Sequence, residues 1–130
     1  MDPHELLETA RSASQRAYVP YSNFHVGAAI LTEGGAVHVG CNVENASYGL
    51  SMCAERNAVA AMVRDSEDRD LKVKRVAVAS PDAAPCMPCG ACRQVLREFG
   101  CEEVVVEEPS GARSYRFEEL LPHSFGPEAL

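Results

Sequence analysis

The sequence predicts an α/β protein: a three-layer α/β/α sandwich in which a mixed five-stranded sheet lies between helices. Two observations lead to this fold class. Apolar, β-prone runs alternate with helical patterns along the chain. In addition, a strand, a helix and a second strand follow one another within about 35 residues, which is typical of a βαβ unit with a parallel strand pair. Residues 1–130 are expected to form one domain.

The N-terminal part is expected to form a helix followed by a hairpin. Residues 3–17 are amphipathic, with Asp2 as a candidate N-cap and Pro3 at the first helical position. Residues 25–32 and 36–43 are apolar and β-prone, and the tripeptide "EGG" between them is a compact turn signal. These two runs therefore predict an antiparallel pair of strands.

The rest of the chain predicts two more helices, three more strands and a short terminal helix. Residues 53–65 are rich in alanine and apolar on several sides, so this helix is expected to be buried. Residues 73–80 and 102–108 read as strands, and residues 91–100 between them read as a helix that ends on a glycine. Residues 111–122 predict an edge strand and a short helix.

The charge of the chain narrows the class of ligand. Twelve basic and nineteen acidic residues give a formal net charge of −7. This sign argues against nucleic acids, membrane surfaces and highly phosphorylated ligands, because polyanion binding depends on Lys and Arg. A small, uncharged substrate is expected instead. No basic, apolar leader and no apolar run of about 20 residues is seen, so a cytoplasmic protein is expected.

The six cysteines of the chain are expected to be reduced in that compartment, where cysteine clusters more often bind metals than form disulfides. Cys53 begins the buried helix, and Cys89 and Cys92 lie at the start of the next one. Helix N-termini stabilise thiolates. If the two helix starts meet, three sulfurs can hold zinc and leave its fourth position open for water.

The segment "SPDAAPCMPCGACRQV" contains two overlapping C-x-x-C pairs, of which Cys89 and Cys92 are the better metal ligands. The glycine between them permits the tight turn that a chelating loop needs, whereas Met-Pro follows Cys86. Cys86 is expected to be a spare thiol beside the site. Cys41 and Cys101 are expected to be small buried hydrophobic residues, and the four histidines form no cluster with metal-ligand spacing.

Glu55 is the candidate that would turn a metal site into a catalytic one. It follows Cys53 by two positions, and such residues point about 200° apart on a helix. Both reach one cavity only if Cys53 lies at the edge of the helix and the metal lies over its end. Glu55 would then contact the water on the metal. The alternative is a first-turn glutamate that interacts only with the helix dipole.

The motifs "CAE" and "PCGACRQ" together resemble the zinc-dependent cytidine deaminase family, in its small homotetrameric branch. The superfamily signature is H-x-E with P-C-x-x-C, and here Cys53 stands in the place of the histidine. The stretches "YVPYSNFHVGAA", "GCNVENASYGLSMCAERNA" and "ELLPHSF" also resemble that branch, so the similarity covers nearly the whole chain.

The resemblance implies a cytidine deaminase-like fold and a hydrolase that acts on a cyclic amidine. Cytidine and deoxycytidine would be converted to uridine and deoxyuridine with release of ammonia, as in pyrimidine salvage. One Zn²⁺ per subunit would be held by Cys53, Cys89 and Cys92, and zinc-bound hydroxide would attack C4 of the base. Glu55 would shuttle the proton to N3 and then help protonate the departing ammonia.

The resemblance also implies the substrate-binding set. Asn42 and Glu44 match positions that contact ribose hydroxyls, and Ala54 is a candidate through its backbone N–H. Phe24 matches an aromatic residue near the nucleoside, and Phe125 matches a residue that a neighbouring subunit of a tetramer supplies. The full substrate-binding set is Phe24, Asn42, Val43, Glu44, Ala54 and Phe125. Tyr48 matches a position that lies at a contact between subunits in that branch of the family.

Arg56 is expected to support the metal site. Zinc with three thiolates carries a formal charge of −1, which weakens its pull on a bound water. A cation that hydrogen-bonds the sulfurs would offset that charge, and Arg56, next to Glu55, is the first candidate. Arg93 is the second. Arg56→Ala is therefore expected to raise the lower pKa of the kcat profile.

Three other functions share some of these features. A structural zinc module would need a fourth ligand, and a polynucleotide deaminase should have a basic groove, which the charge of −7 opposes. Blasticidin-S deaminase is the alternative that uses the same ligand pattern, although "NVEN" and "FHVGAA" favour cytidine. The sequence does not rank cytidine against deoxycytidine.

Overall fold

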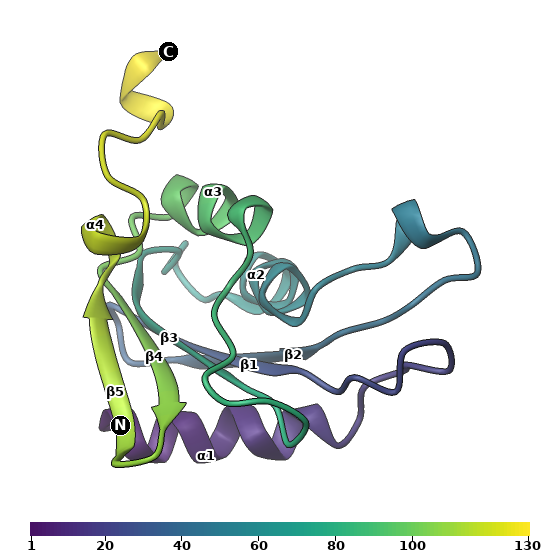
Figure 1. Ribbon diagram of the computed structural model, residues 1–130. Helices are drawn as coiled ribbons and strands as arrows, with labels where there is room; N and C mark the ends of the chain where they lie inside the picture. The colour runs from purple at the N-terminus through teal and green to yellow at the C-terminus, as the bar shows by residue number, and fades with distance from the viewer.

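A mixed five-stranded sheet forms the middle layer of the computed structural model, which describes residues 1–130 (Figure 1). The strands lie in the order β2-β1-β3-β4-β5. Only β3 and β4 pair in parallel, and the other neighbours are antiparallel. The strands are β1 (Gly27–Thr32), β2 (Val37–Cys41), β3 (Val73–Ala79), β4 (Glu103–Glu108) and β5 (Gly111–Arg116). The predicted hairpin and βαβ unit are confirmed.

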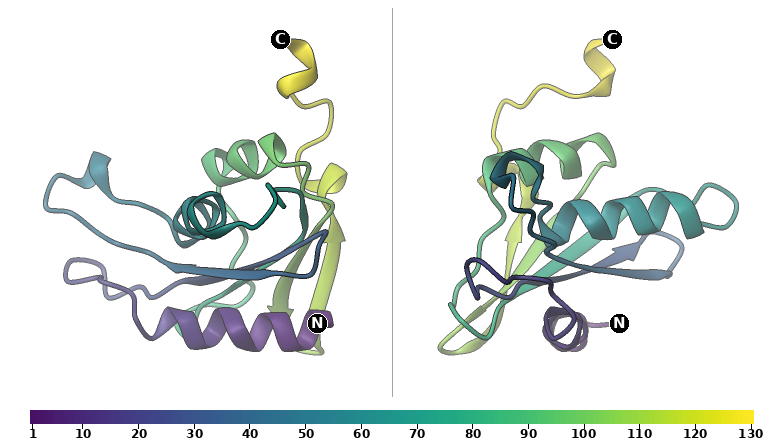
Figure 2. Two further views of the ribbon diagram at one scale, coloured as in Figure 1. Left: turned by 180° about the vertical axis from the view of Figure 1, so that it is seen from behind. Right: turned by 90° about the vertical axis from the view of Figure 1, so that its right-hand side faces the viewer.

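Helices cover both faces of this sheet, which makes the predicted three-layer sandwich. Helix α1 (Pro3–Ser14) lies on one face, and α2 (Ala54–Asp65) and α3 (Gly90–Glu98) lie on the other (Figure 2). Alternate side chains of a strand point to opposite faces. In β1, Ala29 and Leu31 accordingly join the core under α1, whereas Ala28 and Ile30 join the core under α2 and α3.

The first helix begins as predicted but ends earlier. Asp2 Oδ1 accepts a hydrogen bond from Glu5 N at 2.8 Å, and Pro3 occupies the first helical turn. The helix ends at Ser14 rather than at residue 17. The backbone bonds that follow run from each N–H to the carbonyl three residues earlier, so the chain leaves the helix through a tightened turn.

The remaining elements follow the predicted order. Helix α3 is followed by Gly100, whose φ of +63° is a conformation that favours glycine. After β5 the chain forms the short helix α4 (Phe117–Leu120). Two single 3₁₀ turns complete the structure: η1 (Tyr48–Leu50) and η2 (Pro127–Ala129).

Several segments extend from the body of the molecule. Residues 44–52, which carry η1, project beside the loop between α1 and β1, and the C-terminal tail after α4 projects elsewhere (Figures 1 and 2). None of the helices has the length and apolar character needed to cross a bilayer.

Candidate active site

The N-termini of α2 and α3 bring three cysteine sulfurs together on one face of the sheet. Cys53 is the N-cap of α2, and Cys89 is the N-cap of α3. Cys92 lies three residues after Cys89, so both side chains lie on the same side of the first turn of α3. The three Sγ atoms lie within 4.8 Å of one another. The two helix starts therefore meet, as the sequence predicts.

A glycine on β2 determines how closely α2 can lie against the sheet. A Cβ atom at Gly40 would lie 2.4 Å from Ala58 N and 2.6 Å from Ala54 O. The backbone of α2 thus occupies the space that any side chain at residue 40 would need. Asn57 adds a hydrogen bond from its Nδ2 to Cys41 O at 2.8 Å. These contacts position the first turn of α2, and with it Cys53.

The donor set fits a zinc ion. In a tetrahedral site with Zn–S distances of 2.3 Å, two sulfurs are about 3.8 Å apart. The observed grouping within 4.8 Å is compatible with that arrangement. Cys86 does not belong to the group, so the three cysteines can hold a metal ion that keeps one position free, provided that no fourth side chain enters.

Local charges around the sulfurs favour the binding of a cation. The backbone N–H groups of Cys92 and Ala91 at the start of α3 favour the thiolate form of Cys89 and lower the pKa of its thiol. Burial raises the pKa of Cys92, and the negative charges of Glu55 and Cys53 raise it further. Three thiols and a carboxyl group thus share one small volume, and a divalent cation would relieve the repulsion among their charged forms.

Arg56 supplies a cation at this cluster. Its Nη2 atom donates a hydrogen bond to Cys53 Sγ at 3.6 Å, which confirms the predicted contact with a cysteine sulfur. The prediction that Arg93 could also contact a cysteine sulfur is wrong. It donates instead to the carbonyl oxygens of Pro88 and Leu120, each at 2.8 Å. The guanidinium group of Arg93 therefore links the loop before α3 to the end of α4 through backbone carbonyls and does not contact a sulfur.

Glu55 is a buried acid beside the three sulfurs. It lies in the first turn of α2 with only 5% of its surface exposed. Burial raises the pKa of Glu55 above its ordinary value, although its backbone, Cys92 and Arg56 act in the opposite direction. A carboxyl group with a raised pKa next to a candidate metal site is suited to accepting and releasing a proton.

Two adjacent cavities open at this cluster. The inner pocket has a volume of about 180 Å³, and the outer pocket has a volume of about 320 Å³. Asn42 and Cys53 line both of them, so the two pockets share a boundary. The inner pocket is lined by Phe24, Val26, Asn42, Cys53, Ala54, Glu55, Cys86, Met87 and Cys89. The outer pocket is lined by Tyr21, Ser22, Asn42, Glu44, Tyr48, Ser51, Met52 and Cys53.

The inner pocket brings together side chains that the sequence analysis identified separately. Glu55 and Cys53 face the same cavity although they are only two residues apart, because Cys53 lies at the very end of the helix. Phe24 reaches it from the segment before β1, and Ala54 lies at the first helical position of α2. The backbone N–H at that position has no partner within the helix.

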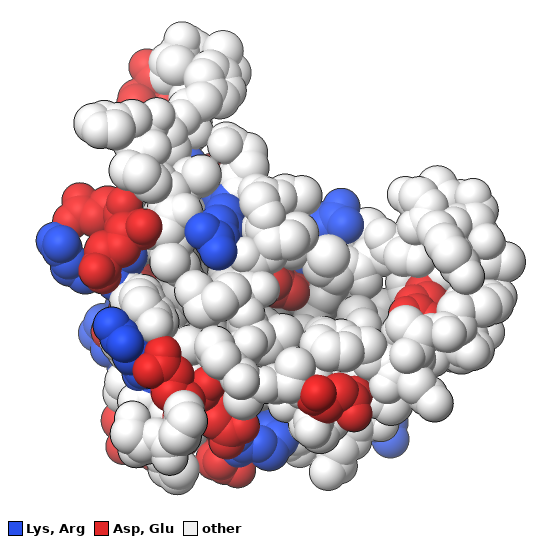
Figure 3. Space-filling view, viewed as in Figure 1, with Lys and Arg blue, Asp and Glu red and all other residues white.

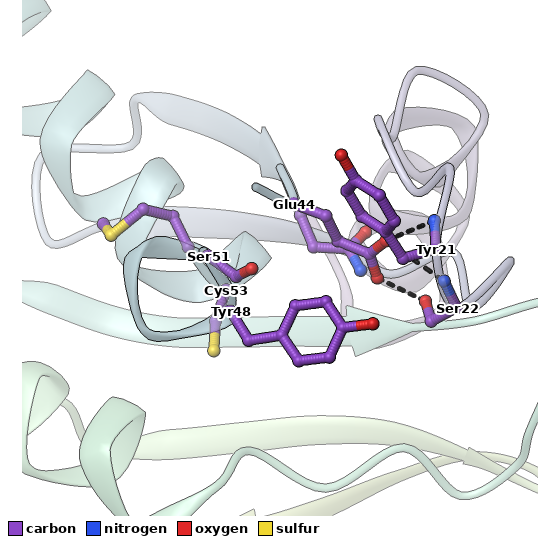
Figure 4. A pocket seen from close by; sticks show the side chains of 8 residues that line it. Tyr21, Ser22, Glu44, Tyr48, Ser51 and Cys53 are labelled. Carbon is purple, nitrogen blue, oxygen red and sulfur yellow. Dashed lines mark hydrogen bonds between the residues drawn. The ribbon is translucent and has the colours of Figure 1, made fainter. Parts of the chain in front are cut away.

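Asn42 and Glu44 each keep some hydrogen-bonding capacity free. Asn42 Nδ2 donates to Phe24 O at 2.8 Å, and its Oδ1 accepts from Val26 N at 2.9 Å. Glu44 accepts from the Tyr21 and Ser22 backbone N–H groups at 3.0 and 3.2 Å and from the Ser22 hydroxyl (Figure 4). An amide can make four hydrogen bonds and a carboxylate about four, so each side chain can still serve a ligand.

The outer pocket has aromatic walls on an open surface. The rings of Tyr21 and Tyr48 lie 6.0 Å apart at an interplanar angle of 57°, and Tyr48 is 74% exposed. Figure 4 shows both rings beside Glu44. The charged side chains on this face gather mainly over α4, β4 and β5, and the hollow beside residues 44–52 is white apart from an acidic patch (Figure 3). This surface suits an uncharged ligand.

Two of the predicted substrate-binding residues line neither the inner nor the outer pocket. Val43 pairs its backbone with Met52, with bonds of 3.0 and 2.9 Å, and so holds the base of the projecting segment. Phe125 lies in the C-terminal tail with 62% of its surface exposed. Gln94 on α3 donates to Phe125 O at 3.0 Å, which ties the backbone of the tail to α3.

The structure also adds pocket residues that the sequence analysis did not assign. Tyr21, Ser22, Ser51 and Met52 line the outer pocket, and Val26 and Met87 line the inner one. Most of them fall inside the stretches that carry the family resemblance, and that resemblance is the sequence feature that could have identified them as pocket residues. Cys86 lines the inner pocket, where burial and the charge of Glu55 raise the pKa of its thiol to about 11.

Comparison with known proteins agrees with this site. The sequence profile described as "Cytidine and deoxycytidylate deaminase zinc-binding region" matches residues 1–108. The chain is 44% identical over 130 residues to the cytidine deaminase of Mycobacterium tuberculosis, covering 100% of this chain and 94% of that protein. It is 41% identical over 133 residues to the cytidine deaminase of Sporosarcina psychrophila, covering 100% of this chain and 96% of that protein.

Solved structures agree as well. The crystal structure of cytidine deaminase from Burkholderia pseudomallei superposes with a TM-score of 0.85 at 45% identity, covering 96% of this chain and 100% of that one. The structure of cytidine deaminase from Mycobacterium tuberculosis superposes with a TM-score of 0.82 at 43% identity, covering 97% of this chain and 98% of that one. The chain therefore belongs to the family of zinc-dependent cytidine and deoxycytidylate deaminases.

Proposed function

We propose that this protein, acting as one domain over residues 1–130, hydrolyses cytidine and deoxycytidine to uridine and deoxyuridine and releases ammonia. The observation that carries the proposal is the juxtaposition of a buried carboxyl group with three cysteine sulfurs. Glu55 lines the inner pocket together with Cys53 and Cys89. With a metal ion held by these sulfurs, such a pocket would combine activation of a water with a group that can move its protons.

Cys53, Cys89 and Cys92 would hold the zinc ion, which supplies Lewis acidity and makes water nucleophilic near neutral pH. Glu55 takes a proton from the water that adds to C4 of the base. It then delivers this proton to ring N3. Glu55 then takes the remaining proton from the new C4 hydroxyl and delivers it to the exocyclic nitrogen. As the bond between C4 and that nitrogen breaks, the carbonyl forms and ammonia leaves.

The two pockets divide the nucleoside between them. The inner pocket would take the base, with Phe24 against its ring and the Ala54 N–H available to its carbonyl oxygen. The outer pocket would take the sugar, where Asn42 and Glu44 have hydrogen-bonding capacity left for its hydroxyls. This order places the reactive edge of the base next to Glu55.

We further propose that the protein works as a homo-oligomer, a tetramer by resemblance to the small branch of the family. The exposed Phe125 on the projecting tail supports this, since it contacts neither pocket of its own chain. In the assembly, Phe125 would complete a pocket of a neighbouring subunit. Tyr48, at 74% exposure on the other projection, would lie at a contact between subunits.

The relatives favour cytidine over blasticidin S as the substrate, since those compared above are named cytidine deaminases. The test is the loss of cytidine absorbance near 280 nm, measured on purified protein with its zinc content determined. Glu55→Gln should keep one zinc per chain and lose about 10³-fold in kcat. Zinc-replete protein that is inert on cytidine but active on blasticidin S would overturn the proposal, as would full activity of Glu55→Gln.

A further inference from the structure

The segment that carries Phe24 lies beyond the end of the sheet, yet its backbone groups are bonded on both sides. The ladder between β1 and β2 ends at the pair Gly27 and Cys41, and the ladder between β1 and β3 ends at Gly27 and Ala79. Residues 24–26 come immediately before Gly27. No regular strand flanks them, so their hydrogen bonds must be made by other groups.

On the side of β2, Asn42 takes the place of a strand. Its side chain bonds to Phe24 O and Val26 N at 2.8 and 2.9 Å, and its backbone N–H donates to Val26 O at 3.2 Å. The residue between these two, His25, has its backbone N–H on the opposite side, as the alternation of an extended chain requires.

On the side of β3, Asp82 takes the place of a strand by accepting hydrogen bonds with a single carboxylate oxygen. Asp82 Oδ2 accepts from the His25 backbone N–H at 2.7 Å and lies 3.1 Å from His25 Nδ1. The Asp82 backbone N–H donates to Ser80 Oγ at 3.0 Å, and Ser80 is buried. Asp82 is thus held by a buried residue at the end of β3, and its side chain bonds to the segment of residues 24–26.

This contact joins two walls of the inner pocket. Phe24 and Val26 flank the gripped residue, and both line that pocket. The loop that contains Asp82 continues to Cys86, Met87 and the metal-ligand candidate Cys89, which line another part of the same pocket. The carboxylate accordingly sets the distance between the Phe24 wall and the loop that leads to the cysteines.

We propose that Asp82 is a positioning residue that holds the Phe24 wall at the separation needed to bind the base, by accepting the His25 backbone N–H. The functional part of this proposal rests on the nucleoside specificity proposed above. The hydrogen bonds from His25 also hold the pKa of the Asp82 carboxyl below its ordinary value, so Asp82 is charged at neutral pH. Hydrogen bonds to a charged acceptor are the stronger kind.

Steady-state kinetics of three substitutions and one control variant test the functional part. Asp82→Ala removes the acceptor and should raise KM for cytidine about tenfold with kcat changed less than about twofold, because the wall loosens while Glu55 and the cysteines stay in place. Asp82→Asn keeps an oxygen for the His25 N–H and should restore KM to within about threefold of the unsubstituted protein. His25→Ala removes only the ring contact and should have a smaller effect than Asp82→Ala. Glu67→Ala, an exposed acid without a side-chain partner, is the matched control for loss of a charge and should change neither constant.

Amide hydrogen exchange tests the geometric part without any substrate. Asp82→Ala should accelerate exchange of the His25 amide at least tenfold, whereas Asp82→Asn and Glu67→Ala should leave it near the original rate. Should Asp82→Ala prove insoluble, Asp82→Ser, whose side chain is too short to reach, replaces it in both experiments.

The two experiments separate the failure of this proposal from the failure of the proposed function. An unsubstituted, zinc-replete protein that is inert on cytidine overturns the function, and the exchange of His25 still decides whether Asp82 holds the segment. Unchanged exchange in Asp82→Ala overturns the positioning role. So does an unchanged KM on an active enzyme, or an Asp82→Asn variant that is as impaired as Asp82→Ala.

Discussion

Arg56 Nη2 donates a hydrogen bond to Cys53 Sγ at 3.6 Å, across the first turn of the helix that also carries Glu55. The guanidinium thereby places a positive charge in contact with a group of three sulfurs. This contact is a direct result of the spacing C-A-E-R at the start of a helix, because residues three apart lie on the same side of it.

Removal of that guanidinium should shift the pH dependence of catalysis. With zinc bound by three thiolates the site has a formal charge of −1, and Arg56 partly offsets it. Arg56→Ala should therefore move the acidic limb of the kcat profile to higher pH, by about one unit. The measurement is kcat as a function of pH. Arg64→Ala, an exposed arginine on the same helix that pairs with Asp65, is the control and should leave the profile in place. An unmoved limb in Arg56→Ala would exclude this role.

The metal content of cysteine variants should distinguish ligands from bystanders. Cys92→Ala removes one of the three clustered sulfurs and should lower the zinc content, measured by atomic absorption, from one per chain to a small fraction. Cys86→Ser is the matched control, because Cys86 lines the pocket but lies outside the cluster, and it should retain zinc. Retention of a full zinc in Cys92→Ala, or its loss in Cys86→Ser, would contradict the assignment.

A methyl group at Gly40 should destabilise the fold. The Cβ of Gly40→Ala would lie 2.4 Å from Ala58 N, so α2 would have to move away from β2. We expect the free energy of unfolding to fall by about 1–3 kcal/mol, a typical cost of overpacking. Urea denaturation measures this change. Gly49→Ala has no atom within 4 Å of the added carbon and should be close to neutral; equal stability of the two variants would refute the explanation.

The Ser22 hydroxyl should be responsible for the acidity of Glu44. The hydrogen bond from Ser22 is the largest effect that lowers the pKa of Glu44 from its ordinary 4.5. A lowered folded-state pKa means that the contact stabilises the folded protein above pH 4.5 and is lost as the pH falls through the lowered value. Ser22→Ala should thus raise the pKa of Glu44 toward 4.5, as followed by NMR titration of its carboxyl carbon. Ser47→Ala, which removes a hydroxyl that does not contact Glu44, should leave this pKa alone, and a Ser22→Ala titration that matches the original would rule the explanation out.

The elements of this fold were predictable because their signals are local. Asp2 and Pro3 mark the start of α1, the "EGG" turn joins β1 to β2, and Gly100 follows α3 with a positive φ. The error at the end of α1 is also local in origin. Residues 15–17 continue the amphipathic pattern of the helix, but their N–H groups bond to carbonyls three residues earlier rather than four. The amino-acid composition of the segment does not distinguish these two hydrogen-bonding patterns.

The sequence by itself determined the candidates for the chemistry of the site: the cysteines whose spacing suits chelation, the carboxylate two residues after Cys53, and two arginines that could face a sulfur. These follow from residue spacing at two helix starts, since the geometry of a helical turn is the same in every protein. Only the tertiary structure decided that Arg93 faces carbonyls, that Phe125 lies away from both pockets, and that Asp82 grips the backbone of His25 from 57 residues away. Such contacts depend on how separate segments pack against one another, and the spacing of residues along the chain does not encode those distances.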